Sequence, residues 1–251
     1  MELISTHDGL LLLAVLLAIS VGALLKGITG LGLPLFAVPA IAMQSTVEQA
    51  VILMIIPGIA SNLWVVINRR THWRLIRKHG PFLAAGFIGG ILGTVLLHAI
   101  SDRWLKILLA TWLAVYLLQY FAGNRNAGLF KGRGALGYIV GLIAGTTQGS
   151  SGISAQIVAP YYHGRSLEAA AYGFLVAFSF LLFSTAQMTG ALTTNLLTPA
   201  RLQLSLMALV PTLIFTRIGI GLADTISPRV FNRILLVVFC LMEIKLIADV
   251  I

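Results

Sequence analysis

The sequence has 251 residues, of which 58% are hydrophobic and only 10% are charged. A soluble domain carries about 25% charged residues, so the composition excludes an ordinary water-soluble protein and indicates one that lies in a lipid bilayer. The formal net charge is +9, but eight of the basic residues fall in two short linkers. That pattern reports membrane topology rather than a nucleic-acid partner.

The first apolar segment follows nine residues that include Glu2 and Asp8 but no lysine or arginine, so we expect it to be retained rather than removed as a signal peptide. Between residues 9 and 47 its only charge is Lys26, which directly precedes GITGLG at residues 27–32. A plain membrane helix needs neither the lysine nor the glycines. We therefore expect the helix to be interrupted at this motif.

Three conventional spans are expected after this motif, over residues 49–67, 81–100 and 104–121. The linkers after the first and third of them hold eight basic residues: Arg69, Arg70, Arg74, Arg77, Lys78, Arg125, Lys131 and Arg133. Because basic linkers remain on the cytoplasmic side, both are expected to face the cytoplasm. The two crossings between them agree with this orientation.

The second front segment, residues 134–164, is uncharged over 31 residues and is divided by QGSSG at 148–152. A helical leg of about 14 residues reaches about 21 Å, which is short of the roughly 30 Å hydrocarbon core. We therefore expect both front segments to be broken helices or re-entrant hairpins, with their glycine turns deep in the protein. Three further spans are expected over residues 169–187, 201–223 and 230–247.

The sequence STVE at residues 45–48 resembles a capping box, in which serine and glutamate side chains bind free backbone amides at the start of a helix. Glu168 stands at the corresponding place in the second half of the chain. Capping is the favoured interpretation for both Glu48 and Glu168, and proton coupling is the alternative.

The second half of the chain repeats the first at shifts of about 120 to 126 residues. Corresponding residues are Gly27 and Gly149, Gly30 and Gly152, Pro39 and Pro160, Glu48 and Glu168, and Arg103 and Arg229. Each basic linker corresponds to a segment without basic residues in the other half, which favours inverted rather than parallel halves. We therefore predict an all-α polytopic membrane protein of two inverted repeats, residues 1–124 and 125–251, in one integral membrane domain. Each repeat has a broken or re-entrant front segment and three transmembrane helices.

A broken backbone at membrane depth leaves amide and carbonyl groups that lipid cannot satisfy. The helix that leaves each break presents free N–H groups and a positive dipole end, which favours an anion, and neither break contains a carboxylate. We expect a small anionic substrate between the turns, with these candidate binding residues: Gly27, Thr29, Gly30, Gly32, Gln148, Gly149, Ser150, Ser151 and Gly152. Lys26 and Arg217 are candidates for charge assistance.

The alternative interpretation of a glycine in a membrane helix is close helix packing. We assign this role to the glycines whose spacing is typical of helix contacts: Gly86, Gly89, Gly90, Gly93, Gly137, Gly141 and Gly145. At GITGLG and QGSSG the glycines are denser, hydroxyl groups intervene, and the two motifs lie at corresponding positions of the repeat. A binding role is favoured there.

The sequences GITGLGLPLFAVPAI and GTTQGSSGISAQIVAPYYHGRSLEAAA resemble the sulfite exporter TauE/SafE family of bacterial membrane proteins. The resemblance covers nearly the whole chain, and the family's glycine-rich turns fall on Gly27, Gly30 and Gly32 and on Gly149 and Gly152. It implies transport of sulfite, organosulfonates or related sulfur oxyanions across the bacterial inner (cytoplasmic) membrane. QGSSG is more hydroxylic than the family pattern, so the individual anion stays open.

These features predict a secondary transporter that works by alternating access, with a proton or sodium as candidate coupling ion, because the chain has no ATP-binding P-loop. A passive anion channel is the alternative. An intramembrane enzyme is less favoured, because the sequence has no HExxH motif and no central carboxylate. No cofactor or metal is expected, since the single cysteine, Cys240, cannot form a metal site by itself. The sequence does not indicate the oligomeric state.

Overall fold

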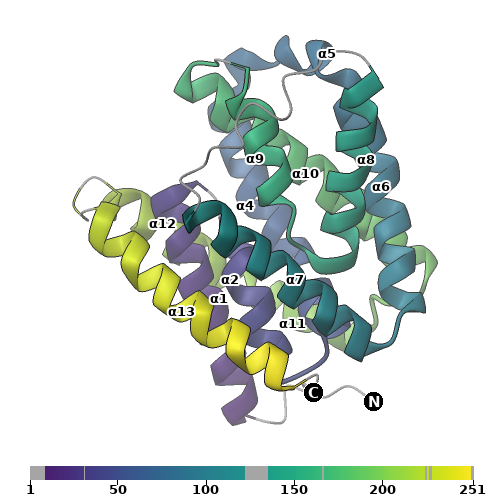
Figure 1. The fold of residues 1–251 in the computed structure, drawn as a ribbon, viewed down its shortest axis with the longest axis vertical. Helices are drawn as coiled ribbons and strands as arrows, with labels where there is room; N and C mark the ends of the chain where they lie inside the picture. The colour runs from purple at the N-terminus through teal and green to yellow at the C-terminus, as the bar shows by residue number, and fades with distance from the viewer. Residues whose placement is uncertain are drawn as a thin grey trace.

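The computed structural model describes residues 9–30, 32–121, 135–165, 167–223, 225 and 228–249, and these residues form helices and turns without a strand (Figure 1). By length and composition, these helical segments of the described chain are able to cross a membrane: Gly9–Thr29, Val47–Asn68, Gly80–Ala99, Ala169–Thr193 and Pro199–Leu222. The predicted all-helical membrane fold is therefore confirmed. The basic residues predicted in the linker 123–133 and the residues before Gly9 lie outside the described chain.

The first half contains, in chain order, α1 (Gly9–Thr29), α2 (Leu33–Ala42), α3 (Val47–Leu53), α4 (Ile55–Asn68), the 3₁₀ helix η1 (Arg70–His72), α5 (Leu75–Lys78), α6 (Gly80–Ala99) and α7 (Asp102–Phe121). The second half contains α8 (Ala135–Ser151), α9 (Ala155–His163), α10 (Ala169–Thr193), α11 (Pro199–Met207), α12 (Leu209–Leu222) and α13 (Pro228–Ala248). Each expected span coincides with one helix or with two consecutive helices. Both front segments are broken where the glycine motifs predict.

The second front segment is a re-entrant hairpin. Its leading helix, α8, runs parallel to α6, and the backbones meet at Gly141 with Phe82, Gly145 with Gly86, and Gly149 with Gly90. Its return helix, α9, leads back to the start of α6, where the Tyr161 ring stacks on Phe82 with ring centroids 3.9 Å apart. The break between α8 and α9 therefore lies about halfway along α6, and the hairpin opens at the Gly80 end of the bundle.

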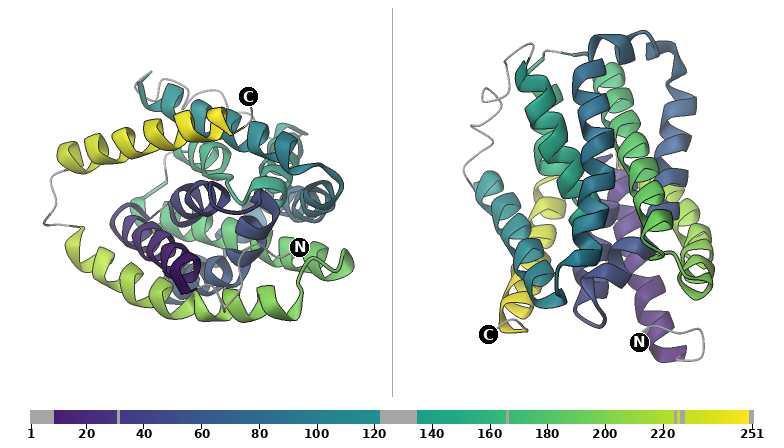
Figure 2. Two further views of the ribbon diagram at one scale, coloured as in Figure 1. Left: turned by 90° about the horizontal axis from the view of Figure 1, so that it is seen from below. Right: turned by 90° about the vertical axis from the view of Figure 1, so that its right-hand side faces the viewer.

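The first front segment folds back in the same way but opens at the other end. Gly22 of the leading helix α1 lies against Leu33 and Ala37 of the return helix α2. The chain then reaches Val47, whose amide donates a hydrogen bond to Asp102 at the start of α7. This is the end at which α6 finishes, so α1 and α8 run into the bundle from opposite ends (Figure 2, right).

The leading helices have 21 and 17 residues, whereas the return helices have 10 and 9. The prediction of about 14 residues for each leg is therefore wrong, because the leading helix is about twice as long as the return helix. The physical reason is that each leading helix also packs on a helix of the other half, α8 on α6 and α1 on α12, while each return helix only has to bring the chain back. Each break is displaced from the middle of its segment.

The leading helices exchange partners between the halves. Helix α1 packs on α12, with Gly27 and Gly219 in backbone contact, and α8 packs on α6. Helices α7 and α13 pack on each other. Two copies related by a two-fold axis are expected to pair in this way, so the arrangement is compatible with the predicted duplication. The inverted repeat and its boundary at residue 124 stay predictions.

The glycines of α6 and α8 confirm the packing interpretation. A Cβ atom at Gly86 would overlap the Phe183 ring, and one at Gly145 would overlap the backbone of Gly86. Gly89 and Gly93 likewise meet the backbone of α8, at Leu142 and Thr146. Gly137 differs, because it faces the Tyr161 hydroxyl rather than α6.

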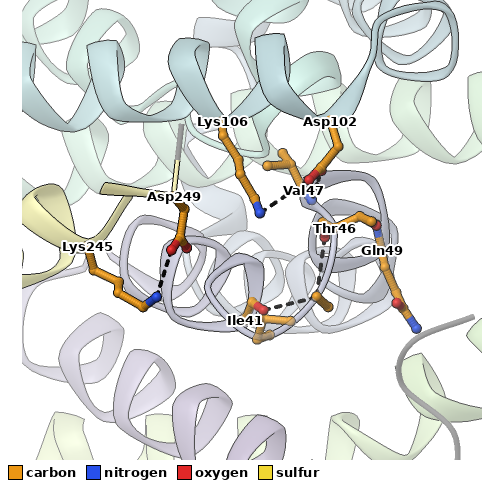
Figure 3. A network of polar contacts seen from close by, with 9 residues as sticks. Ile41, Thr46, Val47, Gln49, Asp102, Lys106, Lys245 and Asp249 are labelled. Atoms are coloured by element: carbon orange, nitrogen blue, oxygen red, sulfur yellow. Dashed lines mark hydrogen bonds and ion pairs between the residues drawn. The ribbon is translucent and has the colours of Figure 1, made fainter. Parts of the chain in front are cut away.

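Two side chains cap the start of α3 (Figure 3). Thr46 Oγ1 accepts a hydrogen bond from the Gln49 amide at 3.1 Å, and Asp102 Oδ1 accepts one from the Val47 amide at 2.8 Å. Lys106 lies one turn further along α7 and pairs with Asp102 Oδ2 at 3.3 Å. The N-cap is therefore Thr46, one residue later than the sequence pattern predicts.

The predicted capping role of Ser45 and Glu48 is wrong. Ser45 Oγ instead donates to the Ile41 carbonyl of α2 at 2.9 Å. Glu48 Oε1 lies 2.9 Å from Arg201 Nη2 of α11, and Glu48 Oε2 lies 3.8 Å from His98 Nδ1 of α6. A charged partner close in space is a stronger attraction than the local amide, so Glu48 joins three helices instead of capping one.

Candidate functional site: a cavity between the two breaks

The two leading helices end in the same way. Gly30 has φ 76° and Gly152 has φ 72°, which is the left-handed region that glycine adopts without a steric penalty. The Gly30 amide donates to the Lys26 carbonyl at 2.8 Å, and the Gly152 amide donates to the Gln148 carbonyl at 2.8 Å. Both helices thus end in a left-handed glycine cap, which turns the chain back towards the membrane face from which it came.

The return helices begin without a capping side chain. The N-cap of α2 is Gly32, with φ 118°, and the N-cap of α9 is Ser154, and no side chain caps either helix. The first amides of an α-helix have no partner within the helix, and the helix dipole places a partial positive charge there. Both breaks therefore present a surface that favours a negative charge.

One cavity lies between the breaks and is lined from both of them. The lining residues are Lys26, Gly30, Gly32, Leu33, Pro34, Leu35, Val51, Met54, Gly58, Asn62, Gln148, Gly152, Ile153, Ser154, Ala155, Phe180, Ser184 and Gln187. No aspartate or glutamate lines it within the described chain. Its volume is about 30 Å³, which holds water but no larger solute. The structure therefore shows the site in a closed form.

Lys26 supplies the positive charge of this cavity. The residue is 6% exposed, and its Nζ donates hydrogen bonds to Ser61 Oγ at 2.8 Å and to Asn62 Oδ1 at 2.7 Å. Both partners lie on α4 and are neutral, and no carboxylate within the described chain forms an ion pair with Lys26. A buried ammonium group without a counter-charge is costly in a membrane, so an anion in this cavity would be stabilised.

Glutamine side chains fix the second break. Gln148 Oε1 accepts a hydrogen bond from Ser154 Oγ at 2.8 Å, which joins the end of α8 to the start of α9. Gln187 Nε2, on α10, donates to the carbonyls of Gln148 at 3.2 Å and of Gly149 at 3.4 Å. These carbonyls lie in the last turn of α8, where the Gln148 carbonyl also accepts the Gly152 amide. The break is therefore fixed by the side chains of Gln148, Ser154 and Gln187.

The sequence profile of the sulfite exporter TauE/SafE family matches residues 14–246 of this chain. The chain belongs to the sulfite exporter TauE/SafE family. Neither a curated protein nor a solved structure gives a significant match to it. Membership in the TauE/SafE family implies a membrane transporter of sulfur-containing anions rather than an enzyme.

The cavity of this TauE/SafE protein contains about half of the predicted site residues. Lys26, Gly30, Gly32, Gln148 and Gly152 line it. Sequence reasoning did not assign Ser61, Asn62 or Gln187 to the site, although Asn62 and Gln187 are conspicuous as polar residues in apolar segments. Their place beside Lys26 and Gln148 follows from packing between helices far apart in the sequence.

The other predicted residues lie next to the cavity of the TauE/SafE protein without lining it. Gly27 packs on the backbone of α12, and Gly149 packs on that of α6. The hydroxyls of Thr29, Ser150 and Ser151 donate to carbonyls four residues earlier, at 2.8, 2.9 and 2.8 Å respectively. Arg217 lines a different cavity, between α4 and α12.

Proposed function

We propose that this TauE/SafE protein is a secondary transporter that moves small sulfur oxyanions, such as sulfite or an organosulfonate, through the cavity between the breaks. The observation that carries the proposal is the buried Lys26 ammonium, which has only neutral partners and lines the same cavity as two uncapped helix starts. Family membership supports the substrate class. The linker between α4 and α6 (residues 69–79, the basic linker below) carries five basic residues, which supports a bacterial inner-membrane location with this linker in the cytoplasm.

In this proposal the oxyanion accepts hydrogen bonds from Lys26 Nζ and from the first amides of α2 and α9. Oxyanions have only acceptor oxygens, and charge-assisted N–H donors bind them most strongly. Gly30, Gly32 and Gly152 have no side chain, so the anion can approach the backbone closely. Gly27, Gly149, Thr29, Ser150 and Ser151 shape the two breaks from outside the cavity.

The closed cavity requires a rearrangement before a substrate can enter. Lys26 is tied to α4 and Gln148 to α10, so an opening that separates these helices would also release the site. We propose that one half rocks against the other, as in transporters built from repeats. A proton and sodium both stay candidates for the coupling ion, but no cavity carboxylate is present within the described chain to carry a proton.

The test is counterflow of radiolabelled sulfite in proteoliposomes that hold unlabelled sulfite. Transient accumulation of label requires a carrier, because a passive anion channel cannot concentrate the label. Lys26→Gln should lower the rate about thirtyfold or more, since it removes the buried positive charge that would pair with the substrate anion. Lys245→Gln is the matched control, because Lys245 of α13 is exposed and pairs at 2.6 Å with Asp249, which follows the helix (Figure 3). Wild-type counterflow in Lys26→Gln would overturn the site.

A further inference from the structure

A second cavity lies between α4 and α12. Its lining residues are Ser61, Trp64, Leu213, Thr216, Arg217, Ile220 and Gly221. Its volume is about 550 Å³, far larger than the closed cavity between the breaks. A small oxyanion with its first water molecules would fit in it without any rearrangement.

Two polar groups of this cavity have no partner in the described chain. Arg217 is exposed, and no described carboxylate forms an ion pair with its guanidinium group. Thr216 is only 7% exposed, and its Oγ1 is buried without a hydrogen bond. The same hydroxyl type on the preceding turn, Thr212 Oγ1, donates to the Ala208 carbonyl at 2.7 Å. Thr216 therefore keeps a donor for a group that would lie in the cavity.

Ser61 connects this cavity to the one between the breaks. It lines the cavity of Arg217, and its Oγ accepts the hydrogen bond of Lys26 Nζ at 2.8 Å. Lys26 lines the cavity between the breaks. The hydrogen bond between Lys26 and Ser61 thus forms part of the partition between a wide cavity and a narrow one.

Building on the proposed function, we propose that the α4–α12 cavity is a second, outer oxyanion site, where Arg217 and Thr216 hold the substrate before it passes Ser61 to reach Lys26. A guanidinium group binds an oxyanion through two parallel N–H donors, and the threonine hydroxyl adds a third. Trp64 lies in the half of α4 nearer the basic linker, and Ser61 lies at the middle of this helix, so the outer site is reached from the cytoplasm.

The outer site is tested directly by protection of a cysteine. Gly221→Cys in a Cys240→Ala background places a single thiol in the cavity, at a position where an added Cβ meets nothing within 4 Å. Methanesulfonate should slow its reaction with N-ethylmaleimide, and Arg217→Gln should abolish the protection, whereas Lys26→Gln should leave it intact. Gly80→Cys, which also has open space, is the unprotected control. Absence of protection would overturn the outer site.

Transport from the cytoplasmic face supplies the second measurement, in inverted membrane vesicles. Arg217→Gln should raise KM for sulfite about fivefold, as expected for loss of one exposed charge contact. Thr216→Val should raise KM less, and Arg217→Lys should lie between the wild type and Arg217→Gln, because lysine keeps the charge but not the two parallel donors. Wild-type KM in both Arg217→Gln and Thr216→Val would overturn the loading role. A different result would overturn only the proposed function. In that case the protein would not transport sulfite at all, while methanesulfonate would still protect the thiol at position 221 through Arg217.

A lipid phosphate is the other source of the same anionic chemistry. The protection experiment is therefore repeated in nanodiscs of neutral phosphatidylcholine and in nanodiscs with anionic phosphatidylglycerol. For an outer substrate site, methanesulfonate protects in both lipids. If phosphatidylglycerol alone protects the thiol, and does so through Arg217, the cavity binds a headgroup and the proposal is wrong.

Discussion

Ser150 and Ser154 lie on either side of the second break, but their hydroxyls have different partners. Ser154 Oγ donates to Gln148 Oε1 in the cavity wall at 2.8 Å, whereas Ser150 Oγ donates to the Thr146 carbonyl of its own helix at 2.9 Å. Ser154→Ala should therefore raise KM for sulfite about threefold or more, because Gln148 loses its anchor. Ser150→Ala should change KM less than about twofold. Concentration-dependent counterflow measures both, and equal effects would contradict the assignment.

His79, which directly precedes α6, makes the protein sensitive to acid. It is 3% exposed, and its ring nitrogens have no hydrogen-bond partner in the described chain. Burial, then the positive charges of Arg165 and Lys78, lower the pKa of His79 from 6.5 to about 4. The unfolded chain therefore binds more protons than the folded protein between these values. The stability contributed by neutral His79 is present above pH 6.5 and is lost as the pH falls towards 4.

Thermal unfolding of detergent-solubilised protein at pH 7.5 and pH 5 measures this effect. The Tm of the wild type should fall more on acidification than that of His79→Gln, whose side chain does not titrate. A difference of 1 kcal/mol corresponds to about 2–4 °C in a chain of this size. His163→Gln, whose side chain is exposed, is the control and should follow the wild type. Parallel curves for the wild type and His79→Gln would rule out the titration.

At the scale of residues, the sequence identified Lys26 as a candidate but not the residues that bind it. Lys26 is conspicuous because it is the only charge in a long apolar segment, and it lines the cavity. Its partners Ser61 and Asn62 are 35 and 36 residues away, so only the tertiary fold, in which α1 and α4 both pack on α12, brings them together. Thr29 and Ser150 do not line the cavity, and their hydroxyls donate to carbonyls of their own helices, as helical hydroxyls often do.

At the scale of elements, the spans and both breaks could be predicted because charge-free runs and glycine clusters depend on sequence alone. The proportions of the hairpins could not, because they depend on which neighbour each leading helix packs against. The cap of α3 was displaced by one residue for the same reason. Asp102 arrives from α7, and Arg201 draws Glu48 away from the helix start.

The crossing of α6 and α8 leaves no room for side chains at its glycines. A Cβ at Gly145 would overlap the Gly86 backbone, whereas one at Gly221 would meet nothing within 4 Å. Gly145→Ala should therefore lower the free energy of unfolding by about 1–3 kcal/mol, and Gly221→Ala should be neutral or stabilise by up to about 1 kcal/mol. Chemical denaturation in detergent compares the two variants. Equal stabilities would mean that the helices separate at little cost.

At the scale of the molecule, two glutamates join the halves at opposite ends. Glu48 of α3 meets Arg201 of α11 at 2.9 Å, and Glu168, just before α10, lies 3.7 Å from His72 in the basic linker. Each pair would have to break for its end of the bundle to open. The structural interpretation of Glu48 is thereby favoured over proton coupling, because both of its carboxylate oxygens lie against basic side chains, those of Arg201 and His98.

This interpretation predicts the behaviour of Glu48→Gln in transport. The variant should keep whatever dependence on a pH gradient the wild type shows, while its Tm falls through loss of the Arg201 ion pair. Arg201→Gln should lower Tm similarly, and the double variant should be no less stable than the worse single one. Uptake with and without an imposed pH gradient measures the coupling. Loss of the gradient response in Glu48→Gln alone would make Glu48 the proton carrier.

The two left-handed glycine caps are alike in their backbones and unlike in charge. Position 26 carries an ammonium group and position 148 an amide, although each lies four residues before its glycine and accepts the same hydrogen bond. The same backbone cap occurs at both breaks, whereas among the described residues of the two caps only Lys26 is a cation. An anion held there would have a positive charge on one side and a neutral amide on the other. A solute with two unlike ends would therefore keep one orientation as it crossed the membrane.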